Sequence, residues 1–201
     1  DRKEIYLVME PGTLLGTWSL KINGHEVKEE DFKVREIYMN TNKAVQISEL
    51  LTEGINRITL EFETDKTFGG IRNPLYICGN FSVERKEGLW SLEKWRETGW
   101  VKDRTRSGIP FYAGTIFYET WLAQGASEIL VEDPFWQDSL TVRLNGRELG
   151  TRAWSPYRFL VPEDGTGTKA AGRLELAVDT TLLGLFEGET FNVEKHRYEE
   201  V

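Results

Sequence analysis

Tryptophan side chains are the residues of this chain best suited to hold a ligand. The sequence contains seven of them, and several stand beside charged residues in segments that read as loops. A sugar ring presents C–H groups that stack on an exposed aromatic face, while nearby Arg or Asp groups form hydrogen bonds with its hydroxyls. We therefore predict a carbohydrate-binding site, with these candidates: Trp95, Trp100, Trp136, Asp138, Arg152 and Trp154.

Burial is the alternative for each of these aromatic rings, because large rings commonly pack in cores or between domains. Trp18 and Trp121 lie in segments that predict strands, and we expect both to be core residues. Trp154 and Tyr157 could likewise pack beneath a hairpin. The aromatic count alone therefore leaves both ligand binding and packing open.

The 33 acidic residues are a second source of chemistry. A pair of carboxylates at a defined separation could hydrolyse a glycosidic bond. Glu10 and Glu132, however, occupy equivalent ends of repeated segments, which favours a structural role, and we assign no catalytic residue. A structural calcium ion is the one cofactor considered, with Glu84, Asp133 and Asp179 as its weak candidate ligands, since no loop has an EF-hand spacing.

The composition of the chain excludes two classes of binding partner. Its formal net charge is -8, which would repel a phosphate backbone, so we expect no nucleic-acid partner. No apolar run approaches the roughly 20 residues of a membrane-spanning helix, so we expect no membrane partner. The single cysteine, Cys78, stands in an apolar stretch and reads as a small buried hydrophobe rather than a reactive thiol. The cellular compartment is not indicated.

An internal repeat organises the 201 residues. Residues 7–10 match residues 129–132, and residues 20–27 match residues 142–149, with the same offset between the copies. Residues 56–60 resemble residues 172–176 at a slightly shorter offset, as a loop of different length would produce. The chain therefore carries one structural unit twice.

Each copy predicts a hairpin. Apolar and polar residues alternate before Asn23 and before Asn145, which is the pattern of a strand with one buried face. The dipeptide Asn-Gly that follows in both copies tolerates positive φ and suits a tight antiparallel turn. Many short strands joined by turns predict an all-β protein with antiparallel sheets packed as a sandwich.

The two copies differ in completeness. The aromatic-rich segment 108–119 could supply an opening strand to the second copy, and the first copy has nothing equivalent. We therefore predict a partial sandwich over residues 1–83, truncated at its N-terminus, and a complete sandwich over residues 84–201. Residues 89–100 could form one or two helical turns between them.

Four motifs support a family resemblance: LYICGNFSV at residues 75–83, GIPFYAGT at 108–115, VRLNGRELG at 142–150 and WSPY at 154–157. In this order they resemble the C-terminal region of large bacterial α-L-rhamnosidase-like glycoside hydrolases of family 106. They more loosely resemble the sugar-binding sandwich of family 2 glycoside hydrolases. The resemblance implies a galactose-binding-like jelly roll attached to a catalytic domain that lies outside this sequence.

These observations favour a non-catalytic, carbohydrate-binding-like accessory region of a bacterial glycoside hydrolase. Its expected partners are a carbohydrate and the catalytic domain of the same polypeptide. The first alternative is a purely structural sandwich that packs on a catalytic domain without binding sugar. The second is a small stand-alone glycosidase, which we disfavour because the chain lacks the length and the βα alternation of a catalytic barrel.

Overall fold

The computed structural model describes residues 4–65, 67–97, 107–132, 138–182, 189–192, 195 and 197–200. These residues form an all-β protein in which the paired strands are antiparallel, as predicted. Short 3-10 helices, η2 (Glu29–Asp31) and η3 (Ser48–Leu50), occur between strands. Within the described ranges there is no α-helix, and no helix long and apolar enough to cross a membrane.

The chain divides into two compact units. Unit 1 comprises residues 1–82 and 92–95, and unit 2 comprises residues 83–91 and 96–201. The strands β10 (Phe81–Lys86) and β11 (Leu89–Lys94) form a two-stranded sheet whose residues are shared between the units. The domain boundary suggested by the sequence, between residues 83 and 84, falls within β10.

The strand β11 corrects the prediction of helical turns over residues 89–100. Glu87 and Gly88 both have positive φ, at 52° and 81°, and this geometry reverses the chain between β10 and β11. Two residues with positive φ form the turn whose twist suits an antiparallel hairpin. Because residues 89–94 pair with β10, they are extended rather than helical, while residues 98–100 lie outside the described residues.

Unit 1 contains two larger sheets and one short one. The first has the order β5-β6-β1-β9, the second has the order β4-β3-β7, and β2 pairs with β8. Their bounds are β1 (Ile5–Met9), β2 (Leu14–Leu15), β3 (Thr17–Ile22), β4 (His25–Val27), β5 (Lys33–Val34), β6 (Lys43–Gln46), β7 (Ile58–Glu63), β8 (Gly70–Ile71) and β9 (Tyr76–Gly79). Leu7 of β1 and Leu20 of β3 belong to one buried apolar cluster, so side chains of both larger sheets form the core of unit 1.

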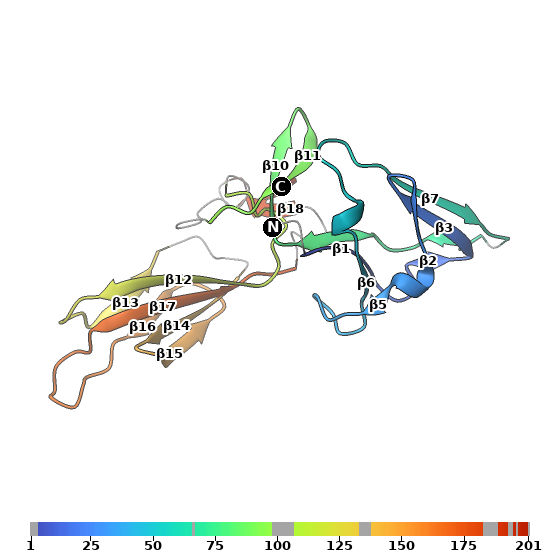
Figure 1. Ribbon diagram of the computed structural model, residues 1–201. Coiled ribbons are helices and arrows are strands. Elements are labelled where there is room, and N and C mark those ends of the chain that lie inside the picture. Colours follow the sequence, from blue (N-terminus) through green and yellow to red (C-terminus); the bar gives the residue numbers. More distant parts are fainter. Residues whose placement is uncertain are drawn as a thin grey trace. The chain divides into compact units, whose positions relative to one another are not determined.

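Unit 2 contains a four-stranded sheet of order β12-β17-β14-β15, and these strands run side by side in Figure 1. Two further pairs are β13–β16 and β18–β19. The bounds are β12 (Thr115–Leu122), β13 (Glu128–Val131), β14 (Ser139–Leu144), β15 (Arg147–Arg152), β16 (Tyr157–Leu160), β17 (Gly172–Asp179), β18 (Glu189–Asn192) and β19 (Arg197–Glu200). Val142 of β14 and Phe159 of β16 belong to one buried cluster, so the four-stranded sheet and the β13–β16 sheet face each other across a core.

The repeat seen in the sequence corresponds to equivalent strand pairs. β1 pairs with β6 in unit 1 as β13 pairs with β16 in unit 2, and β3 pairs with β7 as β14 pairs with β17. The two Asn-Gly turns are confirmed, because Asn23 and Asn145 each have a φ of 51°. Each turn leads into a hairpin strand, β4 or β15.

The same contacts hold the two turn asparagines. The side-chain oxygen of Asn23 accepts a hydrogen bond from the Arg57 backbone N–H at 2.8 Å, and that of Asn145 accepts one from the Arg173 N–H at 3.0 Å. The side-chain NH2 group of Asn145 donates to the Ala171 carbonyl at 2.8 Å, and that of Asn23 donates to the Leu50 carbonyl at 2.8 Å. Each asparagine therefore bonds the start of its next paired strand.

Candidate functional site

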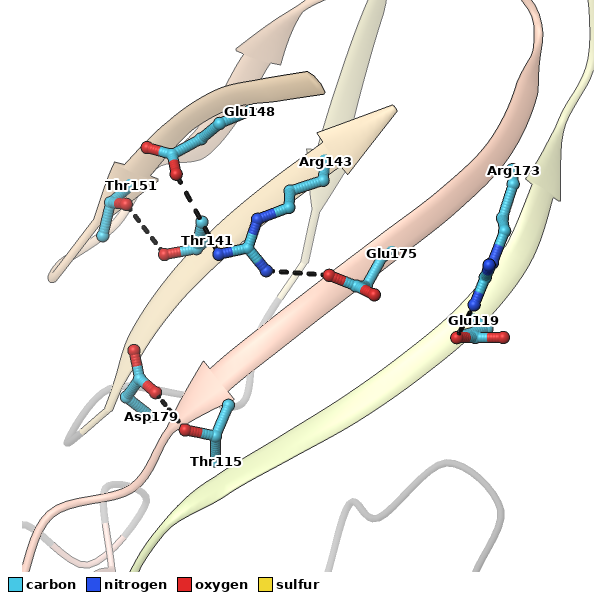
Figure 2. Close-up of polar contacts among 9 residues, drawn as sticks. All are labelled: Thr115, Glu119, Thr141, Arg143, Glu148, Thr151, Arg173, Glu175 and Asp179. Atoms are coloured by element: carbon cyan, nitrogen blue, oxygen red, sulfur yellow. Dashed lines mark hydrogen bonds and ion pairs between the residues drawn. The ribbon is translucent and has the colours of Figure 1, made fainter. Parts of the chain in front are cut away.

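The outer face of the four-stranded sheet of unit 2 gathers polar side chains from all four strands (Figure 2). Alternate residues of a strand share a face, so the apolar residues of β14 and β17 point into the core while their polar neighbours point outward. We call this set the sheet-face cluster; it comprises Thr115, Glu119, Thr141, Arg143, Glu148, Thr151, Arg173, Glu175 and Asp179.

Two arginines organise the charges of the cluster. Arg143 donates from Nη1 to Oε1 of Glu175 at 2.8 Å, and its Nη2 lies 4.0 Å from a carboxylate oxygen of Glu148. Arg173 bonds the carboxylate of Glu119 on the neighbouring strand β12. The hydrogen bond that Arg143 donates to Glu175 raises the pKa of Arg143, and the one that Arg173 donates to Glu119 raises the pKa of Arg173. Both guanidinium groups are therefore fixed in orientation by carboxylates.

Hydrogen bonds of hydroxyl groups continue the cluster along the sheet. Thr115 Oγ1 donates to Asp179 at 2.6 Å, and Ser139 Oγ donates to the second oxygen of Asp179 at 3.4 Å. The hydroxyls of Thr141 and Thr151 lie 2.7 Å apart across β14 and β15. These bonds leave the face polar from one end of the sheet to the other.

Two aromatic rings on β12 share this polar face. Phe117 and Trp121 alternate with Ile116 and Tyr118, which pack against the core of unit 2, so their rings point to the opposite side of the sheet. Phe117 is 58% exposed and Trp121 is 74% exposed. The prediction that Trp121 is a core residue was wrong, because its side chain points away from the core, on the solvent face of β12. The strand pattern itself was correct.

Glu119 lies between these rings and is the register partner of Glu175 on β17. Directly opposed residues on antiparallel strands have Cβ atoms about 5 Å apart. Retaining glycosidases hold their two carboxyl groups about 5 Å apart. Each of them, however, is held in an ion pair by an arginine on an open sheet face. Both carboxylates therefore take part in the ion pairs of the sheet face.

Three of the predicted sugar-binding residues lie at one end of this sheet. Leu140 pairs with Arg152, so the start of β14, next to Asp138, lies beside the end of β15. Trp154 follows β15 and is 75% exposed, which contradicts the alternative that it packs beneath a hairpin, although Tyr157 is buried. Asp138 is also buried, and its Oδ1 accepts a hydrogen bond from the Thr181 N–H at 3.1 Å.

Arg152 contacts its own strand and a ring of the β13–β16 sheet. Its Nη1 donates to the Thr151 carbonyl at 3.0 Å, and its guanidinium lies 5.6 Å from the centre of the Phe159 ring. Trp95 lies in unit 1, directly after β11, and is therefore placed in a different unit from the other described candidates. Trp100 and Trp136 lie outside the described residues.

The described calcium candidates each have other polar partners. Asp179 accepts hydrogen bonds from Thr115 and Ser139, whereas Glu84 forms ion pairs with Lys86 at 3.0 Å and with Arg96 at 3.1 Å. The hydrogen bond from Lys86, followed by that from Arg96, lowers the pKa of Glu84. Asp133 lies outside the described residues, and among the described ones no group of three or more His, Cys, Asp or Glu could hold a metal ion.

Cys78 lies in β9 and is partly buried. Burial raises the pKa of its thiol to about 11, so at neutral pH it carries a proton and is a poor nucleophile. This agrees with its interpretation as a small apolar residue of a strand.

Searches of protein-family models, curated proteins and solved structures find no match to this chain. Phe117 and Trp121 are solvent-exposed aromatic residues that the sequence reasoning missed. The alternation of residues 115–122 puts Phe117 and Trp121 on one face of the strand, opposite Ile116 and Tyr118, but it does not say which face meets solvent.

Proposed function

We propose that this chain is a non-catalytic, carbohydrate-binding-like accessory region of a bacterial glycoside hydrolase, in which unit 2 is a galactose-binding-like jelly roll. The observation that carries the proposal is the pair of exposed rings, Phe117 and Trp121, beside ion-paired arginines on one sheet face. The order of the four sequence motifs supports the link to glycoside hydrolases. The catalytic domain would belong to the same polypeptide, outside these residues.

The face has both components of sugar recognition. Aromatic rings stack on the C–H faces of pyranose rings, while oriented donors and acceptors select the positions of the hydroxyls. Glu119 lies between the two rings along β12, and Arg173 is the register partner of Trp121 on β17. The ion pair between Arg173 and Glu119 holds both groups in place. We expect a sugar ring to lie on Trp121 with its hydroxyls toward this ion pair.

Titration of the 201-residue chain with a panel of plant and host glycans tests the proposal by calorimetry. We expect saturable binding, weakened by about 10-fold in Trp121→Ala, since a stacked ring contributes on the order of 1.4 kcal/mol. Leu160→Ala is the matched control, because Leu160 is an exposed apolar residue of β16, on the other sheet, and its loss should leave binding unchanged.

Other outcomes separate the rival functions. Loss of binding in Trp154→Ala but not in Trp121→Ala would move the site to the loop after β15. Flat isotherms with every glycan would favour the purely structural sandwich. Turnover of aryl glycosides by this chain would support the stand-alone glycosidase and contradict the proposal, which predicts none.

A further inference from the structure

Unit 1 and unit 2 differ at one edge of their equivalent sheets. In unit 2, β17 is bonded to β14 on one side and to β12 on the other, whereas in the described part of unit 1, β7 is bonded to β3 alone. We propose that the free edge of β7 binds an antiparallel peptide strand with the chemistry of β12.

Burial of the matching residues supports this assignment. The repeat aligns Ile58 of β7 with Leu174 of β17, and Leu60 with Leu176. In unit 2, where β12 is present, Leu174 is 5% exposed and Leu176 is buried, whereas Ile58 is 38% exposed and Leu60 is partly buried. An added strand would remove this apolar surface from water, which is favourable.

The backbone of β7 has groups ready for such a strand. Asn23 N–H donates to the Arg57 carbonyl at 2.8 Å, and the register then directs the N–H and C=O groups of alternate residues toward β3. The intervening residues, Ile58, Leu60 and Phe62, direct theirs toward the open edge. Exposed edges of this kind bind extended peptides by strand addition.

A charge identifies the chemistry of the incoming strand. Arg57 aligns with Arg173, whose guanidinium bonds Glu119 of β12. Arg57 is exposed, and its side chain has no ion-pair partner among the residues that the structure describes. A carboxylate at the position of Glu119 would therefore complete the same cross-strand pair in unit 1.

The partner strand is thus defined by three features of β12. It runs antiparallel to β7, it places apolar side chains at the positions of Ile116 and Tyr118, and it carries an acidic residue at the position of Glu119. The probe for the experiment is a synthetic peptide with the sequence of residues 113–123, AGTIFYETWLA.

Fluorescence anisotropy of the labelled peptide, titrated with the 201-residue chain, measures binding at the β7 edge. We expect saturable binding that is about 5-fold weaker in Arg57→Glu, the upper range for a surface ion pair. A peptide carrying Arg in place of its Glu119 should bind Arg57→Glu more tightly than the unmodified peptide does. Arg147→Glu is the matched control and should not weaken binding, because Arg147 is an exposed residue of β15 in unit 2 and makes no contact with the β7 edge in the proposal.

Two N-methylated peptides test the backbone geometry. Methyl groups on the nitrogens of Ile116 and Tyr118, which face the neighbouring strand in unit 2, should abolish binding. Methyl groups on the nitrogens of Phe117 and Glu119 face away and should leave it intact.

Three results would overturn the proposal. The first is no saturable binding of the peptide. The second is weakening by Arg173→Glu rather than Arg57→Glu, which would indicate exchange with β12 in unit 2. The third is self-association of the chain that Arg57→Glu disrupts, together with failure to bind the peptide, which would make a second copy the occupant.

Discussion

Asn23 and Asn145 show how a single side chain can fix both a turn and the strand that follows it. Each has a φ of 51°, a left-handed conformation that most residues avoid and that Asn tolerates. Each also accepts, through its side-chain oxygen, a backbone hydrogen bond at the start of β7 or β17. The residue therefore contributes twice, through its backbone and through its hydrogen bonds.

Replacing Asn145 separates these two contributions. Asn145→Gly keeps the left-handed backbone and loses the side-chain bonds, so we expect a loss of about 1–2 kcal/mol in the free energy of unfolding. Asn145→Ala also places a Cβ at positive φ and should cost about 1 kcal/mol more. Urea unfolding measures both. Equal losses in the two variants would show that the backbone strain does not contribute.

At the scale of the strand, β12 has one face that packs against the core and one face that meets solvent. Its even-numbered residues Ile116, Tyr118 and Leu122 pack against the core of unit 2, and its odd-numbered aromatic residues Phe117 and Trp121 face solvent. Stability should therefore depend on one face of the sheet, and binding on the other.

Stability measurements on the sheet of unit 2 test this division. Trp121→Ala should change the free energy of unfolding by less than about 0.5 kcal/mol, because the ring is exposed. Leu176→Ala, which truncates the buried partner of Tyr118, should cost about 2–5 kcal/mol. A large loss in Trp121→Ala would contradict the outward orientation of the ring and would remove the basis for sugar stacking.

At the scale of the whole molecule, each unit has its own buried cluster. Leu20 belongs to the cluster of unit 1, and Val142, its counterpart in the repeat, belongs to that of unit 2. A core of this kind is the usual basis of a cooperative folding unit.

Hydrogen exchange on the intact chain tests whether the units open independently. Leu20→Ala should cost about 2–5 kcal/mol and speed exchange of the slowest amides in unit 1. Val142→Ala should act in the same way on unit 2. If either variant lowered protection equally throughout the chain, the two cores would be one cooperative unit.

The sequence by itself determined the local features of this protein. The period-two alternation and the Asn-Gly dipeptides predicted the strands and both hairpins, because side-chain phase and φ preference are properties of neighbouring residues. The repeat at a constant offset predicted two equivalent units, and the strand pairs of the structure match it. The all-β class followed from the same patterns.

Only the tertiary structure decided which face of β12 meets solvent and which strand edges are paired. Aromatic residues occur in both phases of residues 115–122, so alternation could not place Trp121 until the neighbouring strand defined the core side. Residues 89–94 were compatible with a helix until pairing with β10 made them a strand. In each case the deciding interactions join segments separated along the chain, and such contacts form only when the sheets pack.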